Sequence, residues 1–156
     1  MASIRSRIGE NMEDRYLSKA KRIDNGEWVE GHYITNEKDP NHAYIGYLFG
    51  VVDGMVHDTD IVEVIPSTIC QCTGIPDKNS KVAYEHDIIE TPVGNAKIIW
   101  NCSLSPTDKH INVGFEVVFL DATANDSYRH DLGYWIGKSN IIGNIFDNKE
   151  LLESEG

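Results

Sequence analysis

The chain has 156 residues, of which 25 are Asp or Glu and 14 are Lys or Arg, giving a formal net charge of −11 at neutral pH. This length suits one domain, which can bury a core without help from disulfides or metal ions. The excess of acid opposes direct binding to the phosphates of nucleic acids or to anionic lipid headgroups, so we expect neither as a partner.

Nothing in the sequence predicts insertion into a membrane. The longest apolar run, residues 44–52, is far shorter than the roughly 20 residues that a membrane-spanning helix needs. Residues 1–11 include two arginines but no apolar stretch of signal-peptide length, so we expect no secretion. We predict that residues 1–11 form a disordered or frayed leader and that residues 12–156 form a single domain.

The three cysteines, Cys70, Cys72 and Cys102, do not have the spacing of a disulfide framework or of a zinc site, which usually takes four ligands. A C-x-C pair in an extended strand places both thiols on one face. We therefore expect buried, reduced thiols with a structural role, and we predict no metal site.

The N-terminal third has the pattern of antiparallel strands. Asn25-Gly26 predicts a type I′ hairpin turn between a strand at about residues 16–23 and a second strand that begins near Trp28. We expect Trp28 to be a core or strand-pairing anchor rather than a platform for a ligand. The apolar residues 43–52 predict a further strand.

A turn at residues 53–54 is expected to lead into an acidic loop that contains His57, Asp58 and Asp60. These side chains are of the metal-binding type, but real sites recruit ligands from several segments, so we expect an ordinary surface loop. The alternating residues 61–66 then predict a strand that ends at a proline.

Residues 77–80 have the composition of a hairpin corner, in which Ser80 would take a left-handed conformation at a cost of roughly 1 kcal/mol. The strand that follows carries Glu85, His86 and Asp87 together. Period-two alternation would place the two carboxylates on one face and the imidazole on the other. We therefore interpret this triplet as scaffold and not as an assembled site.

The rest of the chain repeats the strand pattern. Residues 96–104 and 111–121 are expected to be strands, residues 122–130 a loop, residues 140–148 a last strand, and residues 149–156 a short helical turn or tail. Short strands with regular turn signals and no convincing long helix predict an all-β (mainly β) fold, with antiparallel strands in a barrel or sandwich.

Three segments together resemble the signatures of the YopX family of phage and prophage proteins. They are KRIDNGEWVEG near the start, VIPSTICQCTGIPDKNSKVAYEHDII in the middle and IIGNIFDNKELL at the end, and the resemblance runs from about residue 12 to residue 152. The positions that match the family motifs, which we interpret as structural, are Gly26, Trp28, Thr73, Gly74, Asp77, Asn79, Tyr84, Asp87, Gly143 and Asn144.

The resemblance implies a mainly β fold with an SH3-like portion and an origin in a phage or prophage. The family has no established biochemical activity, so it supplies no catalytic residues, no cofactor and no metal ligands. The sequence departs from the family pattern at four positions: Cys72 replaces a tyrosine, Ser80 and His86 replace glycines, and Lys149 replaces a proline. Because glycine tolerates positive φ, His86 must either adopt that backbone conformation or relax it.

The leading functional hypothesis is a non-enzymatic phage accessory protein in the cytoplasm of the bacterial host. It would act by assembling into a homo-oligomer or by binding a host protein, because small β domains must pair or cover their strand edges.

The alternative is an anti-defence protein, either a sponge for an anionic nucleotide or an acidic mimic of DNA. A sponge needs local positive charge, for which the candidates are Lys19, Lys21, Arg22 and Arg129. A basic pocket within an acidic chain would favour the sponge, and uniformly acidic surface would favour the mimic.

Enzymatic activity is not expected. The available general acid or base groups are His57, His86, His110 and His130, and no nucleophile or metal set accompanies them.

Overall fold

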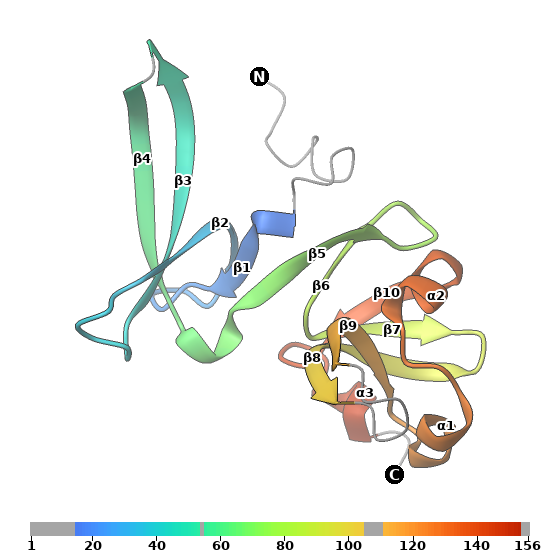
Figure 1. Ribbon diagram of the computed structural model, residues 1–156. Helices are drawn as coiled ribbons and strands as arrows, with labels where there is room; N and C mark the ends of the chain where they lie inside the picture. The colour runs from blue at the N-terminus through green and yellow to red at the C-terminus, as the bar shows by residue number, and fades with distance from the viewer. Residues whose placement is uncertain (1–14, 54, 105–110, 154–156) are drawn as a thin grey trace. The chain divides into compact units, whose positions relative to one another are not determined.

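The computed structural model describes residues 15–53, 55–104 and 111–153 (Figure 1). The predicted leader, residues 1–11, lies outside these residues. The chain is mainly β, as predicted, and its strands form two antiparallel sheets with the orders β4-β3-β2-β1-β5-β6 and β10-β7-β8-β9. Neither sheet closes into a barrel across the described residues.

The strands are β1 (Ser18–Lys21), β2 (Trp28–Thr35), β3 (Ala43–Val52), β4 (Met55–Val64), β5 (Cys70–Pro76), β6 (Val82–Tyr84), β7 (Asp87–Thr91), β8 (Gly94–Leu104), β9 (Ile111–Phe119) and β10 (Asn140–Asn144). The helices are η3 (Pro66–Thr68), α1 (Ala122–Ser127), α2 (Leu132–Trp135), η4 (Ile136–Lys138) and α3 (Lys149–Glu153). The described α-helices are short, as the absence of a long helical pattern predicted.

Contacts divide the chain into two compact units, and each is considered by itself. One unit, residues 13–72, contains β1 to β4 and the first residues of β5. Consecutive strands pair antiparallel, and Cys70 of β5 pairs with Lys19 of β1. Its core is a small cluster of buried residues: Ala20, Val29, Ala43, Ile45 and Val64.

The β1–β2 connection is a hairpin, but the predicted type I′ turn is wrong. Gly26 has a φ of 72°, whereas Asn25 does not have positive φ. The Gly26 N–H donates to the Arg22 carbonyl at 3.0 Å, and the Arg22 N–H donates to the Glu27 carbonyl at 2.9 Å, so the loop spans four residues. The Asn25 side chain accepts a hydrogen bond from the Glu27 N–H at 2.9 Å, which stabilises this longer turn.

The acidic loop predicted after residue 53 is instead the first part of β4. Its backbone pairs with β3 along the whole of a long hairpin, with His57 opposite Gly50 and Asp60 opposite Tyr47. Polar residues do not exclude a strand in an antiparallel hairpin, because such a ribbon need not bury a face along its whole length. The side chains of His57 and Asp58 lie outside the described part of the chain.

Trp28 lies half-buried beside β1 and is not part of the buried cluster of this unit. The ammonium groups of Lys19 and Lys21 lie 4.9 Å and 5.4 Å from the centre of its ring. Lys21 is also its direct partner in the β1–β2 register. Trp28 therefore serves as a strand-pairing residue that covers the lysine side chains.

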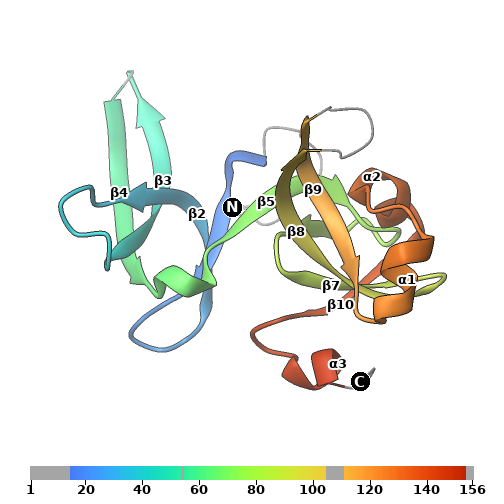
Figure 2. The ribbon, with the colours of Figure 1, turned by 60° about the horizontal axis from the view of Figure 1, so that its bottom comes forward.

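The other unit contains residues 73–156, in which β7 to β10 form the four-stranded sheet. Figure 2 shows α1 and α2 on one side of β8 and β9. The buried cluster between them is Ala83, Ile89, Ala96, Ile98, Val117, Phe119, Ala124, Leu132, Trp135 and Ile136.

Residues 122–130 were predicted to be a loop, and α1 corrects that prediction. Asp121 caps the helix, because its carboxylate accepts hydrogen bonds from the Thr123 N–H at 2.9 Å and from the Thr123 hydroxyl at 2.7 Å. Ala124 is buried in the core. One cap and one buried turn are enough to fix a helix this short when it packs on a sheet.

The segment after the hairpin corner is two strands and not one. β6 ends at Tyr84, and β7 begins at Asp87. The turn between them holds His86 at a φ of 70°. The prediction that His86 points away from Glu85 is wrong, since Nε2 of His86 lies 3.4 Å from Oε1 of Glu85. The alternation of side chains between the two faces of a strand does not continue past a residue with positive φ.

All three cysteines lie in the described part of the chain, and none forms a disulfide. Cys70 and Cys72 are buried on the same face of β5, as the C-x-C spacing predicted, with Gln71 exposed between them. Cys102 is exposed, which corrects the prediction that it is buried. It lies on β8, opposite Val113 of β9.

Candidate binding pocket

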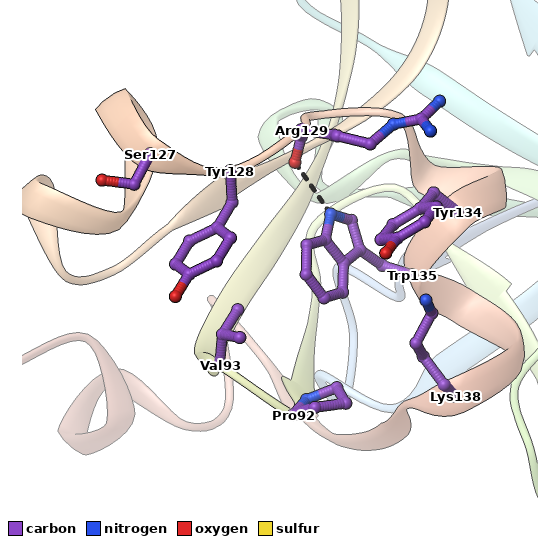
Figure 3. Close-up of a pocket in the computed structure, with 8 residues that line it drawn as sticks. All are labelled: Pro92, Val93, Ser127, Tyr128, Arg129, Tyr134, Trp135 and Lys138. Atoms are coloured by element: carbon purple, nitrogen blue, oxygen red, sulfur yellow. Dashed lines mark hydrogen bonds between the residues drawn. The ribbon is translucent and has the colours of Figure 1, made fainter.

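A concave site lies in the unit formed by residues 73–156, between the β7–β8 turn and the segment that runs from the end of α1 to η4 (Figure 3). Its volume is about 310 Å³. It is lined by Pro92, Val93, Ser127, Tyr128, Arg129, Tyr134, Trp135 and Lys138, which we call the aromatic–cationic pocket.

Trp135 forms the buried base of the pocket, with 4% of its surface exposed. Its ring makes edge-on contacts with Phe119, Tyr128 and Tyr134, at centroid distances of 5.4, 6.1 and 4.8 Å. Its indole N–H donates to the Arg129 carbonyl at 2.8 Å, so the polar end of the buried ring is satisfied. These contacts fix the aromatic surface before any ligand arrives.

Two cations flank the exposed ring of Tyr134. The ammonium nitrogen of Lys138 lies 3.4 Å from the ring centroid, and the guanidinium carbon of Arg129 lies 4.6 Å from it. Figure 3 shows Tyr134 between these two side chains. None of the eight lining residues is acidic. The pocket thus combines aromatic surface with positive charge.

Arg129 is oriented by a neighbouring acid that does not line the pocket. Its Nε–H donates to Oδ2 of Asp131 at 2.8 Å, and this hydrogen bond holds the pKa of Asp131 below its usual range. The bond uses Nε alone, so the terminal nitrogens of the guanidinium are not consumed by it.

The turn that carries Pro92 and Val93 is held by Thr91. The Thr91 hydroxyl donates to the Gly94 carbonyl at 2.6 Å and accepts from the Val93 N–H at 3.2 Å. Thr91 is buried, so this side of the pocket is a fixed turn.

The opposite side is held by Ser139, which is fully buried. Its hydroxyl donates to the Trp135 carbonyl at 2.6 Å, and its own carbonyl accepts from the Lys78 N–H at 3.1 Å. The hairpin corner between β5 and β6 therefore contacts the residue that directly follows Lys138. Residues 127–138, which supply the lining of this side of the pocket, are called the pocket segment. The middle motif of the sequence therefore supports the C-terminal end of the pocket segment.

His130 connects the pocket segment to β9. Nδ1 lies 2.8 Å from the Val117 carbonyl, and Nε2 lies 2.9 Å from the Asn125 carbonyl. Both ring nitrogens can donate at once only when the imidazole is protonated. The bond to Val117 raises the pKa of His130, with the bond to Asn125 and nearby acids adding to it against the effect of burial. His130 therefore has a structural role: it links β9 to α1 through hydrogen bonds to two backbone carbonyls.

Among the motif residues of this unit, Asp77 joins two segments that are far apart in the sequence. Its buried carboxylate accepts backbone N–H groups from Asn79 and Lys81 at 2.9 Å through Oδ1, and from Ile141 at 3.0 Å through Oδ2. The Asn79 side chain donates to the Asn140 side chain at 2.6 Å. The middle and C-terminal motifs are thus joined side by side.

Two further motif residues of this unit, Thr73 and Asp87, form hydrogen bonds with backbone groups. The Thr73 hydroxyl donates to the Ala83 carbonyl at 2.8 Å. Asp87, 3% exposed, accepts from the N–H of Tyr84, which is itself buried. Gly74 has a φ of 72°.

The C-terminal motif forms a turn around Asn144, whose side-chain carbonyl accepts from the N–H groups of Phe146 at 3.0 Å and Asp147 at 2.9 Å. Asn148 in turn accepts from the Asn144 N–H at 3.1 Å. A Cβ on Gly143 would collide with the Asn148 side chain, which packs directly against the backbone here, so this position favours glycine.

The other cations proposed for anion capture have local partners. Arg22 forms a two-point contact with Asp24, and Lys19 and Lys21 lie over Trp28. These three belong to the unit of residues 13–72, and Arg129 belongs to the unit that holds the pocket.

The histidines considered for catalysis have structural surroundings where they are described. His86 packs edge-on against Phe146 at a centroid distance of 5.7 Å, and His130 bonds to carbonyls. His110 lies outside the described residues. His42 was not among the predicted acid or base groups; its Nδ1 bonds to Glu63 and its Nε2 lies 3.6 Å from Asp39.

No three His, Cys, Asp or Glu side chains within the described ranges are arranged to hold a metal ion. No helix in that part of the chain is long and apolar enough to cross a membrane.

A second hollow, in the unit of residues 13–72, has a volume of about 540 Å³ and carries both an acid and a base. Its lining is Ile34, Thr35, Asn36, Glu37, Lys38, Tyr44 and Ile61. It lacks the buried aromatic base of the aromatic–cationic pocket, so we do not assign it a ligand.

Arg129 was predicted from the sequence as a candidate cation, whereas Lys138 and the role of the Tyr134–Trp135 pair were not. The available signal is spacing, because Lys138 follows these aromatic residues by four and three positions, one helical turn. Recognising α2 and η4 as one helical segment would have placed the three side chains together.

Comparison with protein-family models matches residues 12–153 to the family described as YopX protein. A search of curated proteins returned no match.

Proposed function

Because the chain belongs to the YopX family, we propose that it is a phage-type accessory protein that acts by non-covalent binding and not by catalysis. We further propose that the aromatic–cationic pocket is its binding site. One observation supports this most: a chain of net charge −11 places two cations, three aromatic rings and no acid around one hollow.

The charge arrangement favours an anionic ligand. Screening in physiological salt acts over about 8 Å, so a group inside the pocket responds mainly to the nearest charges, here Arg129 and Lys138. The acidic remainder of the chain would repel other anions from the surface around it. The two cations attract an anion that fits within the pocket, and the acidic surface repels larger anions that extend beyond it. The combination gives selectivity for a compact anion.

This arrangement bears on the two anti-defence alternatives. A basic pocket in an acidic chain supports capture of an anionic molecule, and it counts against an acidic mimic of DNA, which would need carboxylates at phosphate-like intervals. A phage protein of this kind would act in the host cytoplasm by removing a soluble molecule. Assembly into a homo-oligomer, binding of a host protein and an SH3-like portion within the fold remain predictions.

Native mass spectrometry of the protein, gently purified from infected host cells, tests the proposal. We expect a small added mass that is lost on denaturation. The double variant Arg129→Ala/Lys138→Ala should lack it. The charge-matched control Lys78→Ala/Lys149→Ala, at exposed residues of the same unit that do not line the pocket, should keep it.

Two results would overturn the assignment of the site. One is a discrete oligomer with no added mass, which would favour self-assembly as the function. The other is added mass that survives the pocket variant unchanged.

A further inference from the structure

We infer that the pocket binds a small molecule that joins one planar aromatic ring to one phosphate group, of which a nucleoside monophosphate is the simplest form. This inference rests on the proposed function, because it names the ligand of the same site. Three features of the pocket carry it: its exposed apolar rim, its two cations and its size.

The rim offers an apolar surface for a planar ring. Tyr128 is 44% exposed and Val93 is 37% exposed, although both line the same hollow. Tyr134 does not add to this surface, because the two cations lie over its ring. Figure 3 shows the Tyr128 ring and Val93 facing the same opening as Trp135. These large apolar side chains are exposed to solvent beside the buried indole of Trp135. They would bury more apolar surface if a flat ring packed on them.

Lys138 offers a partner for one anionic group beside the Tyr134 ring, and Arg129 adds positive charge on the other side of that ring (Figure 3). Lys138 has no carboxylate within 4.0 Å among the described residues, and its ammonium lies over the Tyr134 ring. A phosphate oxygen is a stronger partner for an ammonium than a tyrosine ring is. Arg129 can add donors from its terminal nitrogens while its Nε remains bonded to Asp131.

Size and charge exclude longer polyanions. A volume of about 310 Å³ is at the lower end of the range of roughly 300–1,000 Å³ for small-molecule sites, which suits one ring and one anionic group. A nucleic-acid strand would lay its further phosphates against a chain of net charge −11. The pocket therefore fits a mononucleotide better than a strand.

Isothermal titration calorimetry on the full chain tests the inference, with AMP and UMP as probes and with adenosine and inorganic phosphate as half-ligands. We expect at least one mononucleotide to bind with one site per chain. Each half-ligand should bind at least about tenfold more weakly, because it retains only one of the two contacts.

Variants then locate the binding. Lys138→Ala should weaken mononucleotide binding at least about tenfold through loss of a charge-assisted hydrogen bond. Lys149→Ala, an exposed lysine on α3, should leave the affinity unchanged. Both positions are exposed, so neither variant is expected to disturb folding.

Each contrary result overturns the inference in a different way. Equal affinity for phosphate and AMP would leave an anion site without ring recognition. Tighter binding of a single-stranded oligonucleotide than of AMP would make a strand the ligand. No binding of any mononucleotide at millimolar concentration would reject the ligand class. The proposed function would still stand if native mass spectrometry found an added mass that depends on Arg129 and Lys138.

Discussion

The carboxylate of Asp77 accepts a hydrogen bond from the backbone N–H of Ile141 at 3.0 Å, across 64 positions of sequence. The same carboxylate closes the β5–β6 corner through the N–H groups of Asn79 and Lys81. Burial alone would raise the pKa of Asp77, but these three N–H groups together lower it. One buried side chain thus joins two family motifs and fixes the segment that follows the pocket.

Replacing Asp77 with Asn is expected to destabilise this unit by roughly 2–3 kcal/mol, since an amide nitrogen would face one of the N–H donors. Chemical denaturation followed by tryptophan fluorescence measures this loss. Asp126→Asn, at an exposed position of α1, should change stability little. Equal stability of the Asp77 variant and wild type would mean that the β10 contact contributes nothing.

Ser80→Gly is expected to stabilise the protein by about 0.5–1 kcal/mol. Ser80 has a φ of 66°, where a non-glycine residue costs roughly 1–2 kcal/mol, and part of the gain is offset by the flexibility of glycine in the unfolded chain. Ser80→Ala keeps the backbone cost and serves as the control. Thermal unfolding should rank Gly above Ser and Ala; a glycine variant that melts lower would show that the hydroxyl matters.

Much of the fold could be predicted because it depends on local signals. The strand Ala43–Val52 and the corner at residues 77–80 follow from apolar runs and turn residues. At Ser80 and His86, where the family usually has glycine, the backbone keeps the positive φ that glycine favours. The family pattern therefore carried conformational information that propensity alone did not.

The errors arose where distant contacts decide the structure. The helix α1 depends on Ala124 entering the core. The turn after Tyr84 is held by His86, whose N–H donates to the Ile98 carbonyl at 2.8 Å. The pocket combines Val93 with Lys138, which are far apart in sequence. No periodicity within one segment can predict such a combination.

Gly143→Ala is expected to destabilise the C-terminal turn by roughly 1–3 kcal/mol, because the new Cβ would lie 2.6 Å from Cγ of Asn148. Moving Asn148 away would break its hydrogen bond with the Asn144 N–H. Gly137→Ala is the matched control, since a Cβ there meets no atom within 4 Å. Urea denaturation should separate the two variants; similar midpoints would mean that the turn absorbs the methyl group without strain.

Raising the pH is expected to weaken the attachment of the pocket segment to β9. The hydrogen bond to the Val117 carbonyl raises the pKa of His130 above its ordinary value of 6.5. A raised pKa in the folded state means that the stabilisation is complete below about pH 6.5 and is lost as the pH rises through the folded pKa.

Residue-specific NMR titration of the imidazole measures that pKa directly, and unfolding experiments between about pH 6 and pH 8 measure its effect on stability. The bonds of His42 to Glu63 and its proximity to Asp39 raise the pKa of that imidazole as well, so both histidines contribute to the pH dependence of the whole chain. His42→Asn should therefore leave the contribution of His130 in place, and His130→Gln should remove it. A His130 that titrates at or below 6.5 would mean that its two carbonyl contacts do not hold the ring in its protonated form.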